Sequence, residues 1–283
     1  MLQIVECPRD AMQGIHPFIP TDQKIEYINA LLDCGFDTID FGSFVSPKSI
    51  PQLRDTAEVL NGLTLPKNRS KLLAIIANTR GAEDAVQFDE IDVLGYPFSV
   101  SETFQIRNTQ ATIEKSMGRI EEIKGICDAK GKSLVVYLSM AFGNPYGEPW
   151  NPDLVAEHSY RLVERYGIEI LALSDTIGSS NPAVISTLFS TLIPALPKVT
   201  FGAHLHTTPD TWREKVDAAY RSGCRRFDGA IKGFGGCPMA SDALTGNMPT
   251  ELMLSYFDEH GVDTGVNCLS LAKALEMVPQ IMG

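Results

Sequence analysis

The stretch "NPDLVAEHSYRLVERYGIEILALSD", residues 151–175, places a helical pattern directly before a short apolar run. Its helical part opens with Asn151 and Pro152 and closes on Gly167, residue types that favour the start and the end of a helix. A second apolar run, "SLVVYLSM" at residues 133–140, lies upstream of it. A strand, a helix and another strand in this order predict two parallel strands joined by a crossover helix.

The same alternation extends along the whole chain. Strand candidates occupy residues 3–7, 37–43, 71–78, 91–96, 133–140, 168–175, 199–206 and 224–231. Helical segments between them, such as residues 21–35, 109–131, 151–167 and 208–223, open with Thr or Asn as caps and close on Gly, and two have Pro at the first position. This pattern predicts an α/β protein, a (β/α)8 TIM barrel.

A doubly wound open sheet is the alternative, but the stretch after the first strand, "VECPRDAMQG", lacks the expected GxGxxG loop. Neither an internal repeat nor a long linker divides the sequence. We therefore expect residues 1–283 to form one barrel domain with catalytic loops at the carboxyl ends of the strands. A C-terminal helix is expected from about Leu269 to Val278, stopped by Pro279 and packed on the outside.

The composition narrows the possible partners and compartments. A net charge of −11 argues against nucleic acid and against an anionic membrane surface. The six cysteines form no CxxC pair, which indicates reduced thiols in a cytoplasmic protein. The first residues show no signal peptide, and no apolar run is long enough to span a bilayer.

Polar residues gather where the predicted strands end. In parallel barrels the active site lies at those ends. The residues are Arg9, Asp10, Asp40, Asn78, Tyr137, Ser139, Asp175, His204 and His206, followed by the glycine-rich "GFGGCPMA" and by "TGN". We interpret this collection as an active site.

His204 and His206 are separated by one residue on a strand, so that both side chains face the same way about 6.7 Å apart. Such a pair can bind a divalent cation, or it can be two core histidines bonded to nearby carbonyls. Asp10 lies beside them if the first and eighth strands are neighbours, and Asn247 can add an oxygen. These donors suit Mg²⁺ or Mn²⁺, and Zn²⁺ less well.

Cys237 is surrounded by Gly233, Gly235, Gly236 and Pro238. We interpret this segment as a hinged loop that brings a thiol over the substrate, the alternative being a small apolar residue in a turn. Arg9 carries a permanent charge suited to a developing oxyanion, although a pair of adjacent opposite charges is also typical of a solvated turn.

Two other candidates, Tyr137 and Asp175, have structural alternatives of equal weight. Tyr137 and Ser139 share one face of the fifth strand, where a tyrosine often only packs. Asp175 can orient a histidine from behind the metal ligands, or it can cap the next helix.

Several stretches resemble, in the expected order, the 3-hydroxy-3-methylglutaryl-CoA lyase family of metal-dependent (β/α)8 barrels. They are "IVECPRDAMQ", "TIDFGSFVSPKSIPQ", "YLSMAFGNPYG", "LSDTIG", "AHLHTT", "GFGGCPMASDALTGN" and "HGVDTGVN". The resemblance covers nearly the whole chain. It implies a retro-Claisen cleavage of hydroxymethylglutaryl-CoA into acetyl-CoA and acetoacetate, an acyl-CoA as the small-molecule partner, and a homodimer.

Site residues are carried over at matching positions. The resemblance implies Asp10, His204, His206 and Asn247 as metal ligands, Arg9 as the group that stabilises the enolate, and Cys237 as a proton carrier. Tyr137 and Asp40 complete the implied catalytic set, Gln13, Ser43, Asn78 and Ser139 the substrate-binding set, and Asp175 supports the ligands from behind.

The chain also departs from the family. Thr207 stands where the family usually has Asp, Asp40 where it has Glu, and Ala11-Met12 where it has Gly-Leu. A lyase for a related 3-hydroxyacyl-CoA and a Claisen-type condensing acyltransferase therefore remain alternatives. A metal-dependent hydrolase would carry its HxH on the first strand, and a non-enzymatic barrel would have lost a ligand or Cys237.

Overall fold

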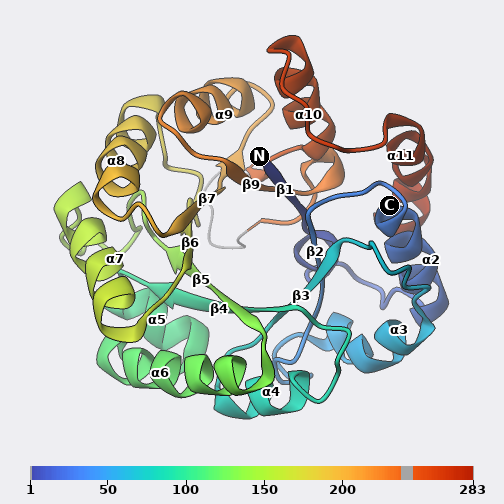
Figure 1. Cartoon of the computed structure of the whole chain (residues 1–283), viewed down its shortest axis with the longest axis horizontal. Coiled ribbons are helices and arrows are strands. Elements are labelled where there is room, and N and C mark those ends of the chain that lie inside the picture. The colour runs from blue at the N-terminus through green and yellow to red at the C-terminus, as the bar shows by residue number, and fades with distance from the viewer. Residues whose placement is uncertain (1, 237–244, 283) are drawn as a thin grey trace.

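The computed structural model describes residues 2–236 and 245–282. Within these residues, eight parallel strands close into a barrel in the order β1-β2-β3-β4-β5-β6-β7-β9, with β9 beside β1 (Figure 1). The barrel strands are β1 (Gln3–Glu6), β2 (Thr38–Ser43), β3 (Lys71–Ile75), β4 (Val93–Ser99), β5 (Ser133–Ser139), β6 (Ile170–Ser174), β7 (Thr200–His204) and β9 (Arg226–Gly229). The predicted (β/α)8 barrel is confirmed.

Helices surround the barrel as a ring (Figure 1). They are α1 (Pro8–Met12), α2 (Thr21–Leu32), α3 (Thr56–Gly62), α4 (Thr79–Ala85), α5 (Glu102–Thr109), α6 (Ile113–Lys130), α7 (Pro152–Tyr166), α8 (Pro182–Ala195), α9 (Trp212–Arg221), α10 (Thr250–Glu259) and α11 (Cys268–Met282). Two short 3-10 turns, η1 (Pro51–Leu53) and η2 (Ile231–Gly233), interrupt the loops.

The helix α7 forms as its sequence predicts. The Asn151 side chain accepts a hydrogen bond from the Leu154 N–H at 2.8 Å, and Pro152 occupies the first turn, where its missing donor costs nothing. Gly167 ends the helix with a φ of +65°, a conformation that glycine adopts without strain.

Three predicted helix starts are wrong. Thr109 ends α5, and α6 is capped instead by Thr112, whose hydroxyl accepts a hydrogen bond from the Lys115 N–H at 3.2 Å. Thr21 lies inside α2, which has no side-chain cap, and α9 begins at Trp212 rather than after Thr208. The Thr211 hydroxyl accepts a hydrogen bond from the Thr208 N–H at 2.9 Å, so this segment closes as a turn before the helix begins. Pro209 therefore precedes α9 and does not occupy its first position.

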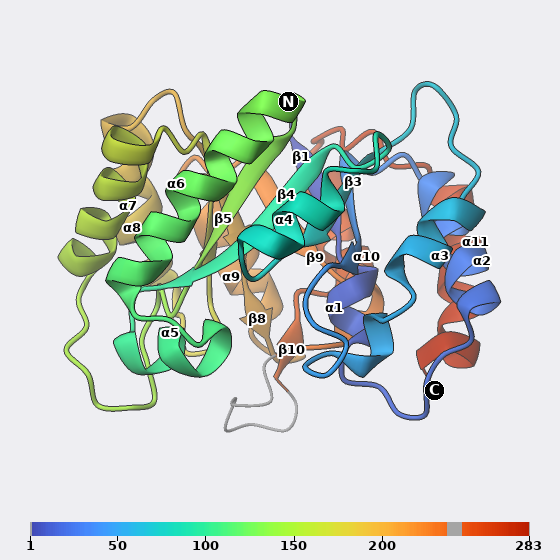
Figure 2. The same cartoon turned by 90° about the horizontal axis from the view of Figure 1, so that it is seen from below.

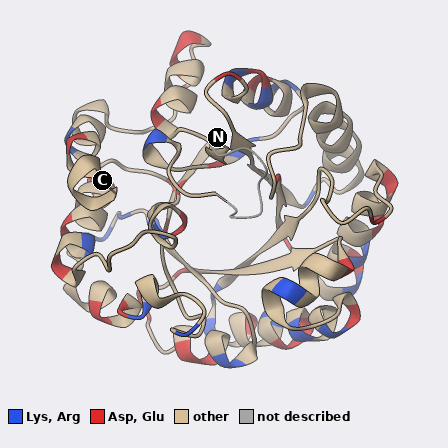
Figure 3. Cartoon of the chain, turned by 180° about the vertical axis from the view of Figure 1, so that it is seen from behind, with Lys and Arg blue, Asp and Glu red and all other residues tan. Residues whose placement is uncertain are grey.

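The apolar residues form two layers. The larger lies between the strands and the helices, and a smaller cluster fills the barrel interior with Leu73, Ile75, Val93, Val135, Tyr137 and Ala172. Strands buried on both faces explain the nearly continuous apolar runs in the sequence. Charged residues of both signs are interspersed on the outer helices (Figure 3). Across the described residues we find no helix that is both long and apolar enough to cross a membrane.

The last helix is longer than its sequence suggests. α11 continues through Pro279 to Met282, which corrects the predicted stop at Val278. Ile281 and Met282 are buried, so their packing offsets the backbone hydrogen bond that the proline removes. α11 lies against α2 on the outside of the barrel, as expected (Figure 1).

Beyond the barrel strands, β8 (His206–Thr207) pairs antiparallel with β10 (Gly246–Asn247). Figure 2 shows this small sheet with α1 and α5 at the end of the barrel opposite the N-terminus. This is the end where the carboxyl termini of the strands meet. The predicted site residues come from this mouth of the barrel.

Candidate active site

Barrel closure brings residues from the first and the last strands of the barrel together at the mouth. Asp10 lies in α1, directly after β1, whereas His204 ends β7 and His206 begins β8. Since β9 pairs with both β1 and β7, these residues approach one another although almost 200 positions separate them in the sequence. The antiparallel pairing of β8 with β10 places Asn247 opposite His206.

Asp10, His204 and His206 form a group in which the candidate ligand atoms all lie within 4.8 Å of one another. The Nδ1 of His204 lies 3.2 Å from Asp228 Oδ2, and the Nδ1 of His206 lies 3.0 Å from the Thr176 carbonyl oxygen. Both contacts engage Nδ1 and leave Nε2 of each ring for another partner.

His206 Nε2 is buried and has no hydrogen-bond partner within residues 2–236 and 245–282. A buried polar nitrogen without a partner is costly, because it has lost water and gained nothing in return. Next to the carboxylate of Asp10, this nitrogen fits a bound cation. The donors present therefore match a divalent metal, and two core histidines bonded to carbonyls would not leave this atom free.

The charges around the group favour an ionised Asp10 and a neutral His206, whereas they favour the protonated form of His204. Burial and, to a smaller extent, the neighbouring His204 together lower the pKa of His206 to about 4. Burial works against the ionisation of Asp10, but Arg9 and both imidazoles outweigh it and lower the pKa of Asp10 below its usual value. Burial also disfavours the charged form of His204, yet its contact with Asp228 leaves the pKa of His204 raised.

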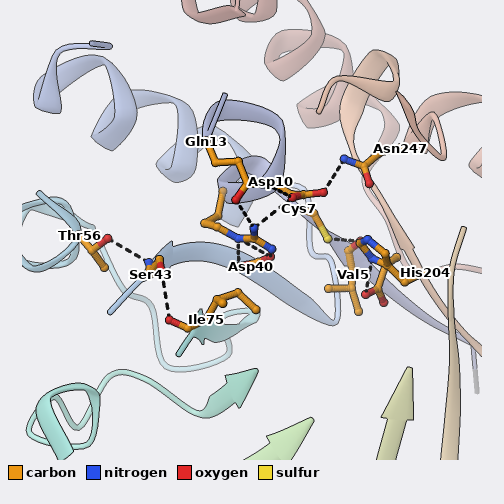
Figure 4. A network of polar contacts seen from close by, with 12 residues as sticks. Val5, Cys7, Asp10, Gln13, Asp40, Ser43, Thr56, Ile75, His204 and Asn247 are labelled. Atoms are coloured by element: carbon orange, nitrogen blue, oxygen red, sulfur yellow. Dashed lines mark hydrogen bonds and ion pairs between the residues drawn. The ribbon is translucent and has the colours of Figure 1, made fainter. Parts of the chain in front are cut away.

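Two amides fix the Asp10 carboxylate (Figure 4). Asn247 Nδ2 donates to Asp10 Oδ2 at 2.8 Å and to the Phe234 carbonyl at 2.8 Å. Gln13 Nε2 donates to Asp10 Oδ1 at 2.7 Å. The nitrogen of Asn247 is used in this way, whereas its Oδ1 has no donor among the described residues and can face an ion. Gln13 contacts the ligand shell directly, in addition to the substrate-binding role that we expected for it.

Arg9 is held beside this group by a fork of hydrogen bonds. Its Nε and Nη2 donate to Asp40 Oδ2 at 3.0 and 2.6 Å, and its Nη1 reaches Asp10 Oδ1 at 3.1 Å and Gln13 Oε1 at 2.9 Å. Burial raises the pKa of Asp40 to about 6, although Arg9 acts in the opposite direction. Asp40 thus serves as the anchor of a rigid guanidinium.

The other predicted site residues differ in the groups that they contact. Tyr137 points into the barrel, packs edge-on against His204 with ring centroids 5.5 Å apart, and has a buried hydroxyl without a hydrogen-bond partner in the described part of the chain. Ser139 is buried two residues further along the same strand. Ser43 Oγ lies 3.3 Å from the Ile75 carbonyl, and Asn78 Oδ1 accepts from the Gly81 N–H at 2.9 Å as the cap of α4. Cys237 lies outside the described residues.

Asp175 does not contact an imidazole. It accepts hydrogen bonds from the Ser180 N–H at 3.0 Å and from Lys215 Nζ at 2.9 Å, and the same Nζ donates to the His206 carbonyl at 2.8 Å. Asp175 therefore supports the backbone of His206 through Lys215. This arrangement differs from a direct contact with a ligand ring.

Three functional neighbours were absent from our expectations, namely Lys215, Arg226 and Asp228. Arg226 and Asp228 alternate on β9, and Asp228 contacts His204. A signal for them existed, because "CRRFDGAI" places two charges at alternate positions of a strand that should be buried. Such charges must be paired inside the barrel.

Comparisons with known proteins agree with this geometry. A family model described as HMGL-like matches residues 2–278. A cytoplasmic 3-hydroxy-3-methylglutaryl-CoA lyase of Rattus norvegicus is 35% identical over 283 residues, covering 98% of this chain and 80% of that protein. A hydroxymethylglutaryl-CoA lyase of Bacillus subtilis is 32% identical and covers 98% of this chain and 91% of that protein. The structure of an HMG-CoA lyase from Acinetobacter baumannii in complex with coenzyme A and 3-methylmalate has a TM-score of 0.91 and 32% identity, covering 100% of this chain and 92% of that one.

Proposed function

The chain belongs to the HMGL-like family and is a lyase of the hydroxymethylglutaryl-CoA lyase kind, and we propose that it uses a divalent cation held at the barrel mouth. Its reaction is the retro-Claisen cleavage of 3-hydroxy-3-methylglutaryl-CoA into acetyl-CoA and acetoacetate. The substrate hydroxyl loses a proton, the adjacent carbon–carbon bond breaks to leave a ketone, and the thioester enolate takes up a proton.

The observation that supports the metal most strongly is the unpartnered Nε2 of His206 beside Asp10 and His204. These three residues and the Oδ1 of Asn247 would hold the ion. Their nitrogen and oxygen donors suit Mg²⁺ or Mn²⁺ better than Zn²⁺. When bound, such an ion eases deprotonation of a coordinated hydroxyl and polarises a carbonyl.

Arg9 supplies the fixed positive charge that an enolate requires. Its guanidinium is already oriented by Asp40 and Gln13, so little reorganisation is needed when negative charge develops. We assign to Asp40 the orientation of Arg9. Tyr137, Ser43, Asn78 and Ser139 are assigned to the walls of the acyl pocket.

The partner is an acyl-CoA, which agrees with the coenzyme A bound in the similar Acinetobacter baumannii enzyme. We further propose that the 283 residues act as one catalytic domain in the cytoplasm, and that the enzyme is a homodimer. Size-exclusion chromatography with light scattering tests the last point, because a mass of one chain would contradict it.

The deciding experiment is a cleavage assay with several CoA thioesters. We expect 3-hydroxy-3-methylglutaryl-CoA to yield acetyl-CoA and acetoacetate, EDTA to stop the reaction, and Mg²⁺ or Mn²⁺ to restore it. If a related 3-hydroxyacyl-CoA is preferred, the changes at Asp40 and Thr207 have altered the acyl specificity. Full activity in EDTA would rule out the metal mechanism.

Cys237→Ala tests the proposed proton carrier. We expect its thermal unfolding midpoint to be unchanged and its kcat to fall by about 10²- to 10⁴-fold, the usual contribution of an acid–base group. Cys268→Ala is the matched control, because Cys268 is an exposed free thiol in α11. Equal kcat values for the two variants would remove Cys237 from the mechanism.

A further inference from the structure

A buried ion pair lies beneath His204 inside the barrel. Arg226 and Asp228 are alternate residues of β9, so both side chains point inward, and only 4% and 0% of them is exposed. Arg226 Nη1 donates to Asp228 Oδ1 at 2.6 Å. The mechanism proposed above uses neither residue. Burying two charges in a barrel interior costs hydration free energy, so a role for this pair has to be sought.

The neighbouring strand β7 leaves room for Arg226 and supplies a partner for Asp228. In the register between β7 and β9, Gly202 lies opposite Arg226 and His204 lies opposite Asp228. A Cβ atom on Gly202 would lie 2.6 Å from Arg226 Nη1, so the absence of a side chain there makes room for the guanidinium. The second oxygen of Asp228 lies 3.2 Å from His204 Nδ1. Each oxygen of the carboxylate therefore has its own partner.

We propose that Arg226 and Asp228 are positioning residues that keep the proton of His204 on Nδ1 and so present Nε2 to the metal. An ionised carboxylate only accepts hydrogen bonds, so the ring nitrogen that faces it must carry the proton. The other ring nitrogen then keeps its lone pair for a cation. This inference rests on the proposed function, because it concerns the same cation site.

A second group of candidate ligand atoms lies next to the first. Cys7, His204 and Asp228 form it, and these atoms lie within 4.8 Å of one another. Both oxygens of Asp228 are already bonded there, to Arg226 and to His204, whereas His206 Nε2 in the first group has no partner among the described residues. This difference favours the group made by Asp10, His204 and His206 as the place of the ion.

Asp228→Asn provides a sharp test. Arg226 has no acceptor atom, so the amide oxygen of the new Asn must face Arg226 and its NH₂ group must face His204. The proton of His204 then moves to Nε2, the atom that the metal needs. We expect the affinity for Mn²⁺, measured by electron paramagnetic resonance, to fall by about 10- to 100-fold, the usual cost of losing such a support.

The double variant Arg226→Met/Asp228→Asn distinguishes positioning from a general loss of structure. Without Arg226 the amide can turn, so that its oxygen accepts from His204 Nδ1 again. We expect the double variant to bind Mn²⁺ more tightly than Asp228→Asn does. Removing both charges of a buried pair is also tolerated better than removing one, so this protein folds even if the single variant does not.

Asp55→Asn is the matched control. Asp55 is a buried carboxylate paired with Lys24 at 2.7 Å, and neither residue has a hydrogen bond or ion pair with Asp10, His204 or His206. This variant should be destabilised, yet it should bind Mn²⁺ like the wild type.

Nitrogen-15 labelling of the five histidines reports the tautomer of His204 directly, without metal. We expect Nδ1–H in the wild type and Nε2–H in Asp228→Asn. An Nε2–H tautomer in the wild type, unchanged Mn²⁺ affinity in Asp228→Asn, or weaker binding in the double variant than in Asp228→Asn would each overturn the inference. Absence of Mn²⁺ binding in the wild type, with the Nδ1–H tautomer present, would instead contradict the proposed function alone.

Discussion

Arg9 illustrates how a single side chain gains its role from the groups that surround it. In the sequence it is one half of an adjacent pair of opposite charges, and such pairs are usually solvated. In the structure it is buried and donates to Asp40, Asp10 and Gln13. The planar fork of a guanidinium is what allows these contacts at the same time. The role proposed for Arg9 therefore depends on the shape of the guanidinium as well as on its charge.

Arg9→Lys tests this dependence. A lysine keeps the charge but cannot make the bidentate contact with Asp40, so we expect kcat to fall by about 10²- to 10³-fold. The affinity for Mn²⁺ should change only slightly, since Asp10 keeps its bonds to Asn247 and Gln13. Steady-state kinetics together with an Mn²⁺ titration separate the two effects, and a kcat close to that of the wild type would refute the role of the fork.

At the scale of elements, Glu6 links the end of β1 to the last part of the barrel. Its Oε1 accepts from the Ile231 N–H at 2.9 Å, and its Oε2 accepts from the Thr250 hydroxyl at 2.5 Å. These two partners lie before and after the stretch that carries Cys237 and Asn247. Burial raises the pKa of Glu6 to about 8, because a charge there loses its hydration.

This pKa predicts a specific dependence of stability on pH. Below the ordinary pKa of about 4.5 the carboxyl is protonated in both states, and above about 8 it is ionised in both. Between these values the folded state holds the proton more tightly, so the free energy of unfolding falls as the pH rises. The loss attributable to Glu6 is at most on the order of 5 kcal/mol.

Glu6→Gln isolates that contribution. We expect the free energy of unfolding of this variant, measured in urea at pH 5, 6.5 and 8, to fall less with pH than that of the wild type. Other titrating groups, such as Asp40, contribute equally to both proteins and cancel in the difference. Parallel curves for the two proteins would show that Glu6 does not titrate in this range.

At the scale of the whole molecule, the proposed metal ion would join the beginning of the barrel to its end. The candidate ligands from α1, β7 and β8 are brought together only by folding, so an ion bound there stabilises the folded state. At an Mn²⁺ concentration of about 100 times Kd the gain is about 2.7 kcal/mol. For a chain of this size that corresponds to a rise in Tm of about 4–5 °C.

His206→Ala should abolish most of this shift. Thermal unfolding is to be followed for both proteins with EDTA and with Mn²⁺, and the EDTA curves serve as the baseline for each variant. The same rise in Tm in His206→Ala would mean that the ion binds elsewhere.

The fold could be predicted from the local pattern of residues in the sequence. Eight apolar runs separated by helical segments are recognisable because the residues that make a strand or a helix are neighbours in sequence. Errors arose where a tertiary contact outweighed a local rule. Pro279 was expected to stop the last helix, but the burial of Ile281 and Met282 carries the helix past it. Thr208 was expected to cap a helix, but it forms a turn with Thr211.

The candidate site was also predictable only in part, for the same reason. The sequence by itself determined which chemical groups stand at the strand ends: a carboxylate and a guanidinium after the first strand, and two imidazoles at the seventh. Only the tertiary structure decided their partners, such as Asp228 with His204, Asp40 with Arg9, and Lys215 between Asp175 and His206. The physical reason is that periodicity records which way a side chain faces, whereas a contact across a barrel depends on strand register and closure, which arise from the packing of the whole chain.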